Sequence, residues 1–374
     1  MVMSTHPTEV PPVLDSVADL DAAWVETVLR AGGHPDAQVA AITHEPVGAG
    51  NVSDTVRVAI SYAAGHADGG PDALVVKFRP SAPGAHAHAL GSGAYHREIG
   101  GYRAVGASGA CRIPRTYFVG GDETTINLVM EDLTTAAVPG NQVAGCSSVE
   151  AEAVVTQFAR LHSAFPLDDA TAPDWLIRLP AVCDYWSDAT TRGAELSLAR
   201  FADSLPAEDL AIVAAAPGVV RPWHLKSQSR LTLTHGDPRV DNVLFETLPD
   251  GRPGAVLIDW QVTGLRNPMY DVGYFLSGSV DVAQRRADEH RLLRHYVDVF
   301  AERGGSYDLE EATADYQLQL LSGLFITLAA VAVLPDNEVV NRLILALLER
   351  NCAAARDWHS IEAMRNVSGV LAPA

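Results

Sequence analysis

The stretch "LTLTHGDPRVDNVLF", residues 231–245, decides the fold of this chain, because a polar turn interrupts two apolar, strand-like runs. The polar residues that stand out are His235, Gly236, Asp237 and Asn242. The glycine permits tight backbone geometry, and the flanking apolar runs predict strands that anchor the turn. We therefore expect the turn to hold a carboxylate and a carboxamide at fixed positions on the floor of a cleft.

A further carboxylate, Asp259, closes the apolar segment "VLID" seventeen residues after Asn242. Oxygen atoms of Asn and Asp are ligands that Mg²⁺ prefers, with phosphate oxygens and water completing the octahedron. Asp237 would then be free to orient an acceptor hydroxyl and take its proton. The spacing predicts Asn242 and Asp259 as Mg²⁺ ligands beside a catalytic Asp237.

Three features upstream complete a set. Lys77 stands in the apolar segment "LVVKF", where a buried ammonium needs a counter-charge, and Glu98 follows on an expected helix. Gly48 and Gly50 precede a strand and would let backbone N–H groups approach a phosphate. Taken singly, each also fits an ordinary turn, a lysine reaching solvent at a sheet edge, or a solvated helix residue. Their order along the chain is the one that phosphoryl transfer from a nucleotide requires.

The chain of 374 residues is long enough for one large domain or two lobes. Alternation at residues 56–62 and an apolar run at 73–80 predict strands, whereas the Gly-, Ala- and His-rich residues 81–93 suggest a mobile loop. Helical periodicity dominates from about residue 147, except for a β-like island at 231–262. We expect an α+β protein with a loose N-terminal segment (1–19), a β-rich N-terminal lobe (20–133) and a mostly helical C-terminal lobe (134–374).

Composition narrows the class of protein. A formal charge of −19, from 27 basic and 46 acidic residues, disfavours binding to nucleic acid or to an anionic membrane. The longest apolar run, residues 323–335, is shorter than the ~20 residues of a membrane crossing and predicts a buried helix. The N-terminus has no signal-peptide pattern, and the four scattered cysteines suggest buried, reduced thiols. We expect a cytoplasmic protein of undetermined oligomeric state.

The motifs together resemble those of the aminoglycoside phosphotransferase and choline kinase superfamily, relatives of the eukaryotic protein kinases. Within it, "LVMEDL" (128–133), "HGDPRVDNVLF" (235–245), "LIDWQ" (257–261) and "YDVGYFLSGS" (270–279) look most like the ecdysteroid-kinase-like branch and its bacterial counterparts. The resemblance extends from about residue 40 to about residue 350. It implies a bilobal protein-kinase-like fold with a small antiparallel sheet in the N-terminal lobe.

The resemblance also implies a role for each residue. Lys77 would contact the α and β phosphates of ATP or GTP, held by Glu98, and Asp237 would be the catalytic base. His235 and Asp271 would brace the catalytic loop. The other implied contacts are the phosphate loop (Gly48, Gly50, Asn51 and Ser53), the strand whose backbone pairs with adenine (Glu131 to Leu133) and the Mg²⁺ ligands (Asn242 and Asp259).

The sequence leaves the acceptor open. Trp260 and Gln261 follow the metal aspartate, and no Ala-Pro-Glu element is present, which favours a small-molecule acceptor over a protein. Apolar or amphipathic alcohols such as steroids, terpenoids or polyketides are favoured slightly over aminoglycosides. This preference supposes that some aromatic residues of the helical lobe line the cleft instead of the core (Trp175, Tyr185, Trp186, Trp223, Tyr274 and Phe275). The alternatives are a hydroxyacyl-CoA kinase, a non-catalytic nucleotide-binding protein, and an unrelated hydrolase using Asp237 and His235.

Overall fold

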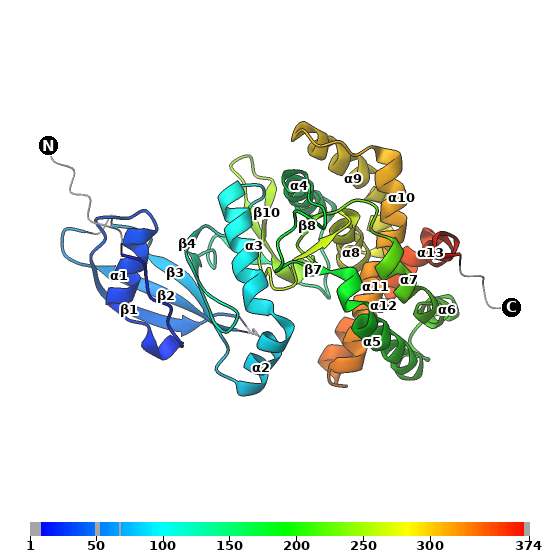
Figure 1. Cartoon of the computed structure of the whole chain (residues 1–374), viewed down its shortest axis with the longest axis horizontal. Helices are drawn as coiled ribbons and strands as arrows, with labels where there is room; N and C mark the ends of the chain where they lie inside the picture. The colour runs from blue at the N-terminus through cyan, green and yellow to red at the C-terminus, as the bar shows by residue number, and fades with distance from the viewer. Residues whose placement is uncertain (1–8, 49–52, 67–68, 370–374) are drawn as a thin grey trace. The chain divides into compact units, whose positions relative to one another are not determined.

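The computed structural model describes residues 9–48, 53–66 and 69–369. The chain forms two compact units, one of residues 1–109 with 113–136 and one of 110–112 with 137–374. The first contains an antiparallel sheet, and the second is mostly helical (Figure 1). The predicted α+β class is confirmed.

The first unit is built on a five-stranded antiparallel sheet in the order β1-β2-β3-β5-β4. Helix α1 (Ala22–Ala31) follows Asp21, whose side chain caps the Trp24 N–H. Its apolar stripe is buried in one cluster with residues of β2, β3 and β5. This packing forms the core of the unit. The strands are β1 (Val39–Pro46), β2 (Asp54–Tyr62), β3 (Ala73–Phe78), β4 (Thr116–Gly121) and β5 (Ile126–Glu131).

The prediction of a loop at residues 81–93 is wrong. The structure has a helix there, α2 (Pro83–Ser92), which is followed directly by α3 (Ala94–Ser108). Pro83 occupies the first turn, where its missing N–H costs nothing. Gly93 has a φ of 68°, a left-handed conformation that ends α2 and redirects the chain into α3. Small residues without an apolar stripe concealed this helix from periodicity arguments.

The segment 1–19, expected to be loose, is held in place over its described residues. The Trp24 indole donates to the Pro12 carbonyl at 2.7 Å, and the Leu14 N–H donates to Asn127 Oδ1 at 2.5 Å. Ser16 then caps a short 3-10 helix, η1 (Val17–Asp19), through a reciprocal capping box. Hydrogen bonds to the sheet and to α1 therefore order this part, while residues 1–8 lie outside the described residues.

The second unit packs helices around two three-stranded sheets, β10-β9-β6 and β7-β11-β8. Its strands and 3-10 helix are β6 (Ala137–Pro139), β7 (Ile177–Arg178), β8 (Thr232–Thr234), η2 (Val240–Asn242), β9 (Val243–Thr247), β10 (Pro253–Leu257) and β11 (Gly264–Arg266). Its helices are α4 (Ser148–Ala164), α5 (Leu179–Arg200), α6 (Ala207–Ala215), α7 (Pro217–Lys226), α8 (Met269–Ser279), α9 (Val282–Glu302), α10 (Leu309–Gln319), α11 (Leu321–Val333), α12 (Glu338–Asp357) and α13 (Ser360–Ser368).

The core of the second unit is centred on α11, into which most of the apolar run at 323–335 falls, as predicted. Helix α5 approaches α11 closely because Gly193 has no side chain; a Cβ there would lie 1.7 Å from the Leu328 carbonyl oxygen. Among the described residues, the stretch Leu309–Val333 is the one helical segment long and apolar enough to cross a bilayer. Because 67% of its most apolar 18-residue window is buried within the protein, the stretch also fits a core helix. The cysteines are free; three are buried, and Cys146 is partly exposed.

Candidate active site

The polar turn after β8 has the tight geometry that the sequence suggested. Gly236 has a φ of 88°, and a Cβ at this position would lie 2.1 Å from the carbonyl oxygen of Val262. Both the backbone conformation and the available space therefore require glycine. This fixes the direction in which the chain enters Asp237.

Asp271, at the start of α8, anchors the turn through hydrogen bonds to its backbone. Its buried carboxylate accepts the backbone N–H of His235 at 2.6 Å and that of Gly236 at 3.0 Å. Burial is the largest influence on the pKa of Asp271 and raises it, but His162, His235 and the Gly236 N–H together bring the pKa below its usual value. The carboxylate is thus ionised and acts as a fixed acceptor for the turn.

His162, near the end of α4, extends this bracing network. Its Nε2 lies 3.1 Å from Asp271 Oδ2 and its Nδ1 lies 2.9 Å from the Tyr296 hydroxyl. Burial raises the pKa of Tyr296 well above its usual value, so the phenol keeps its proton. Because the ionised Asp271 can only accept, Nε2–H of His162 donates to it. The sequence offered only one signal for His162, a histidine on the apolar face of a helix.

His235 is almost fully buried, and both of its ring nitrogens contact backbone. Nε2 donates to the Ile258 carbonyl at 2.8 Å, and Nδ1 accepts the Asp237 N–H at 3.4 Å. The ring thus connects the turn to the end of β10. The expected bracing role of His235 fits these contacts better than a direct chemical role does.

The carboxylate of Asp237 is held by four hydrogen bonds. Oδ1 accepts from Arg239 Nε at 3.0 Å and from the Tyr274 hydroxyl at 3.2 Å. Oδ2 accepts from Arg239 Nη2 at 3.2 Å and from Asn242 Nδ2 at 2.9 Å. Burial is the largest influence on the pKa of Asp237 and raises it, but the charge and hydrogen bonds of Arg239, with His235 and Tyr274, bring it below its usual value. Asp237 is therefore ionised at neutral pH.

Asn242 and Asp259 are aligned by the ladder between β9 and β10. The Ile258 N–H donates to the Asn242 carbonyl at 3.1 Å, which continues the pairing of Leu257 with Val243. Asp259 follows with a φ of 67°, one of two left-handed conformations among the described non-glycine residues. Such a conformation is costly unless the surroundings fix it, and it turns the chain sharply beside Asn242. The structure thus brings together the two residues predicted as metal ligands.

In the first unit, Lys77 and Glu98 form the predicted ion pair. Lys77 Nζ lies 2.6 Å from Glu98 Oε1, and the two side chains are only 10% and 1% exposed. Lys77 is paired on both sides of β3, by β2 and β5, so it is not at a sheet edge. The alternative of a lysine reaching solvent at an edge is wrong for this position.

The remaining candidate residues of the first unit lie on separate elements. Gly48 has a φ of 76° after β1, and Ser53 is nearly buried before β2. Glu131 ends β5, where its carboxylate accepts the Arg115 N–H at 2.8 Å, and Leu133 is 7% exposed. Gly50 and Asn51 lie outside the described residues.

Besides His162, two residues that contact Asp237 were missed by sequence reasoning. Arg239 was not singled out, and Tyr274 was assigned to the set of aromatic residues more typical of a core. Tyr274 is indeed 2% exposed, yet its hydroxyl reaches Asp237, whereas Trp223 and Phe275 of the same set are fully packed. Burial raises the pKa of Tyr274 well above its usual value, with the nearby Asp237 charge adding to it, so the hydroxyl remains a donor.

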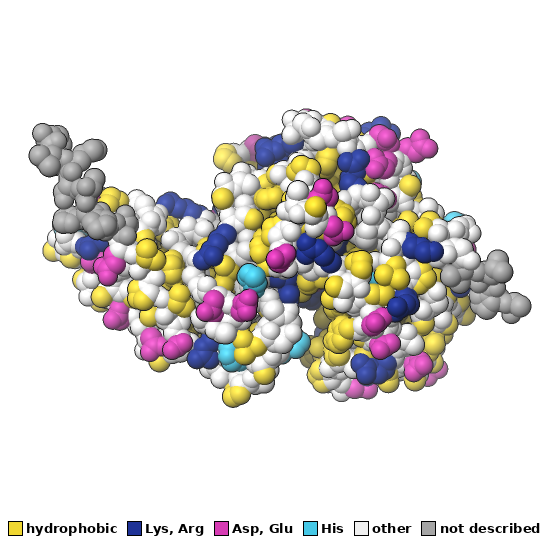
Figure 2. Space-filling view, viewed as in Figure 1, with side chains coloured by type: hydrophobic (Ala, Val, Ile, Leu, Met, Phe, Trp, Pro, Cys, Tyr) yellow, Lys and Arg dark blue, Asp and Glu magenta, His cyan; other side chains and the backbone are white. Residues whose placement is uncertain are grey.

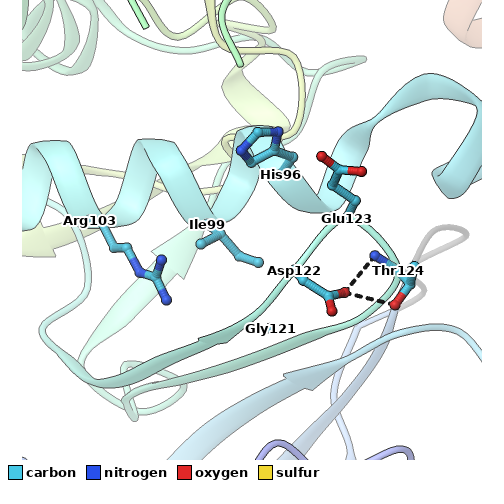
Figure 3. A pocket seen from close by; sticks show the side chains of 7 residues that line it. All are labelled: His96, Ile99, Arg103, Gly121, Asp122, Glu123 and Thr124. Carbon is cyan, nitrogen blue, oxygen red and sulfur yellow. Dashed lines mark hydrogen bonds between the residues drawn. The ribbon is translucent and has the colours of Figure 1, made fainter. Parts of the chain in front are cut away.

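A hollow of about 360 Å³ in the first unit lies apart from these residues (Figure 3). His96, Ile99 and Arg103 of α3 line one side, and the turn Gly121–Thr124 lines the other, where Asp122 accepts from Thr124. None of the candidate residues that the structure describes lines this hollow. Its side chains carry both signs of charge and select no single ligand class.

Comparison with known proteins supports part of this assignment. Residues 218–305 match the model of the ecdysteroid kinase-like family, a segment that includes the turn, Asp259 and Asp271. The match confirms the predicted resemblance and agrees with the predicted enzyme class, a small-molecule kinase. A curated mouse protein, acyl-CoA dehydrogenase family member 10, is 42% identical over 53 residues, which is 14% of this chain and 5% of the mouse protein. The chain thus spans only a small part of that relative.

Several solved structures are similar at low identity. An ethanolamine kinase from Plasmodium vivax is 10% identical with a TM-score of 0.48, covering 93% of this chain and 94% of its own. A choline kinase from Streptococcus pneumoniae is 14% identical with a TM-score of 0.47, covering 87% and 98%. A macrolide 2'-phosphotransferase from Brachybacterium faecium is 15% identical with a TM-score of 0.43, covering 84% and 100%.

Proposed function

We propose that this chain transfers the γ-phosphoryl group of ATP or GTP to a hydroxyl group of a small molecule, with Mg²⁺ as cofactor. The observation that carries the proposal is the fixed arrangement of Asp237, Asn242 and Asp259 at the end of one buried ladder. An ionised carboxylate beside two oxygen ligands is the arrangement that phosphoryl transfer uses.

In this proposal Asp237 orients the acceptor hydroxyl and receives its proton as the bond to phosphorus forms. Asp271, His162 and His235 position Asp237 through the backbone of the turn. None of these three needs to contact a substrate. A turn held at both ends by buried hydrogen bonds limits the motion of the catalytic carboxylate, which phosphoryl transfer requires.

The donor set at Asn242 and Asp259 fits Mg²⁺. The two N–H groups of Asn242 are both donated to Asp237, at 2.9 Å each, which leaves Oδ1 as the end that faces a cation. Within the described residues no group of three or more His, Cys, Asp or Glu could hold a metal. The ion would therefore need nucleotide oxygens and water to complete its shell, as Mg²⁺ commonly does. When bound, Mg²⁺ neutralises charge on the phosphates.

The first unit supplies nucleotide contacts in this proposal. Lys77, held in position by its ion pair with Glu98, would contact the α and β phosphates. Gly48 and Ser53, with Gly50 and Asn51, would cover the phosphates, and the backbone from Glu131 to Leu133 would pair with the base. A buried lysine held by a fixed carboxylate has an ammonium group in a defined position, which such a contact needs.

For the acceptor, we favour an apolar or amphipathic alcohol over a polycation such as an aminoglycoside. Arg239 stands beside the carboxylate that would receive the hydroxyl proton, so an ammonium group arriving there is repelled by a guanidinium. Acidic and basic side chains stand next to each other on the face drawn in Figure 2, so the formal charge of −19 does not describe one pocket.

The alternatives receive less support. A CoA-bound acceptor would need a basic patch, yet the arginines of the candidate segment 285–295 are largely paired, Arg285 and Arg286 with Asp357 and Arg291 with Glu152. A hydrolase that used His235 with Asp237 would need a free imidazole nitrogen, and both nitrogens contact backbone. A non-catalytic nucleotide-binding protein would bind Mg–nucleotide without turnover.

The test is a thermal-shift titration with ATP, GTP and a non-hydrolysable analogue, with and without Mg²⁺, followed by a screen of alcohols for phosphorylation. A ligand at a hundred times its Kd adds about 2.7 kcal/mol of stability, a readily measured shift. We expect a Mg²⁺-dependent shift that Asp259→Ala loses. The absence of a shift with any nucleotide would overturn the proposal, and activity without nucleotide would favour the hydrolase.

A further inference from the structure

The four hydrogen bonds to Asp237 leave no place for an acceptor. A carboxylate offers about four lone-pair sites, two on each oxygen. Arg239 fills one on each oxygen, Tyr274 fills the second on Oδ1, and Asn242 fills the second on Oδ2. A hydroxyl that is to give its proton to Asp237 must therefore displace one of these donors.

Arg239 is the donor that can leave. Tyr274 is 2% exposed within a fully buried helix, and Asn242 is 7% exposed and locked by its backbone to Ile258. The Arg239 side chain is 30% exposed, and its partners are two carboxylates, Asp237 and, at 3.7 Å, Asp241. Both hydrogen bonds of Arg239 go to a carboxylate, and another anion such as a phosphoryl group offers the same charge-assisted bonds to a long, partly exposed side chain.

We propose that Arg239 is a catalytic residue that moves from Asp237 to the transferred phosphoryl group; the proposal rests on the phosphotransferase function above. The acceptor oxygen forms its bond to the γ-phosphorus while the bond from that phosphorus to the β,γ-bridging oxygen breaks. The hydroxyl proton passes to Asp237, and the bridging oxygen leaves with the nucleoside diphosphate. Arg239 binds the equatorial oxygens of the phosphoryl group during this exchange.

The movement of Arg239 would have two consequences: it would open the acceptor position and stabilise the transition state. While Arg239 pairs with Asp237, the carboxylate cannot accept a hydroxyl, so the acceptor position is closed. When a phosphoryl group takes the guanidinium, one lone pair on each oxygen of Asp237 becomes available. A guanidinium aimed at charge that develops in the transition state contributes more there than in the ground state.

The test compares wild type with Arg239→Met, Arg239→Lys and Arg239→Ala. Arg252→Met is the matched control, because Arg252 is an exposed arginine that also pairs with a nearby aspartate, Asp250. Three quantities are measured without any identified acceptor: the Kd of Mg–ADP or Mg–GDP, the tightening of that Kd by aluminium fluoride as a mimic of the transferred group, and the slow hydrolysis of the triphosphate.

We expect Arg239→Met to keep the diphosphate Kd, to lose the tightening by aluminium fluoride, and to hydrolyse triphosphate about 10²- to 10³-fold more slowly. Arg239→Lys should recover part of the rate, and millimolar guanidinium should partly rescue Arg239→Ala. Arg252→Met should behave as wild type in all three measurements. A merely structural role for Arg239 would move the diphosphate Kd and would not be rescued by guanidinium.

Other outcomes would contradict either the catalytic role of Arg239 or the phosphotransferase proposal itself. If Arg239→Met binds the mimic and hydrolyses triphosphate like wild type, or faster, Arg239 only covers Asp237 and the catalytic assignment fails. If wild type binds no nucleotide, the phosphotransferase proposal fails and this inference with it. If Arg239→Met does not fold, Arg239→Lys, which keeps the charge but not the planar fork, carries the same comparison.

Discussion

At the scale of single residues, Asp237 is the side chain on which the proposed reaction depends most directly. Asp237→Asn keeps the size of the side chain but removes the proton acceptor, so phosphoryl transfer should fall by about 10²- to 10⁴-fold. The Kd of Mg–nucleotide should change little, because the carboxylate acts on the acceptor. Rates and affinities of Asp237→Asn and of Asp250→Asn, an exposed control aspartate, decide the matter. Near wild-type turnover in Asp237→Asn would remove Asp237 from the role of base.

Lys77 and Glu98 allow stability and binding to be separated. Lys77→Met leaves the buried Glu98 carboxylate without this partner, which should cost about 3–5 kcal/mol of unfolding free energy and weaken nucleotide binding. The double variant Lys77→Met/Glu98→Gln removes both charges and should recover most of the stability but none of the affinity. Urea unfolding and nucleotide titration of both variants test this expectation. Recovery of affinity in the double variant would show that Lys77 serves only the fold.

At the scale of elements, α4 and α8 hold the turn after β8 through His162 and Asp271, and this bracing predicts an acid-dependent stability. The pKa of Asp271 is below its usual value in the folded chain, whereas the pKa of an unfolded aspartate is about 3.9. Asp271 therefore stabilises the fold above about pH 4 and loses this contribution as pH falls through the lowered folded pKa. Asp271→Asn should be less stable than wild type at neutral pH, by at least about 3 kcal/mol, because several buried bonds to a charged acceptor are lost.

The measurement is urea unfolding of wild type and Asp271→Asn from pH 7 down to the acid limit of folding. The difference in unfolding free energy should be constant near neutral pH and shrink below about pH 4. Because wild type and Asp271→Asn share all other carboxylates, the titration of those groups cancels in the difference between the two unfolding free energies. A difference that stays constant into the acid range would contradict the bracing role assigned to the ionised Asp271.

The elements also show what a sequence can and cannot predict. The proximity of Asp237 and Asn242 was predictable, because fixed spacing between two strands leaves few geometries. The pairing of Lys77 with Glu98 was predictable because a buried charge requires a partner. Helix α2 was not predictable, because its Ala, Gly and His residues form no apolar stripe. The contact of His162 with Asp271 joins residues 109 positions apart, and no local pattern encodes it. Arg239 lies within the motif, but its ion pair with Asp237 depends on the backbone conformation of the turn, which the sequence does not show.

At the scale of the whole molecule, the formal charge of −19 opposes the approach of a Mg–nucleotide, which is itself negative. Exposed charges act over about 30 Å at 0.01 M ionic strength but only about 8 Å at 0.15 M. The association rate constant should therefore rise with salt over this range, the reverse of electrostatic steering to a basic site, while dissociation also quickens as phosphate contacts are screened. Stopped-flow measurements with a fluorescent nucleotide, and with the uncharged nucleoside as control, test this. A rate constant that falls with salt would mean that local cations such as Arg239 dominate the field at the entrance, so that composition misjudges the site.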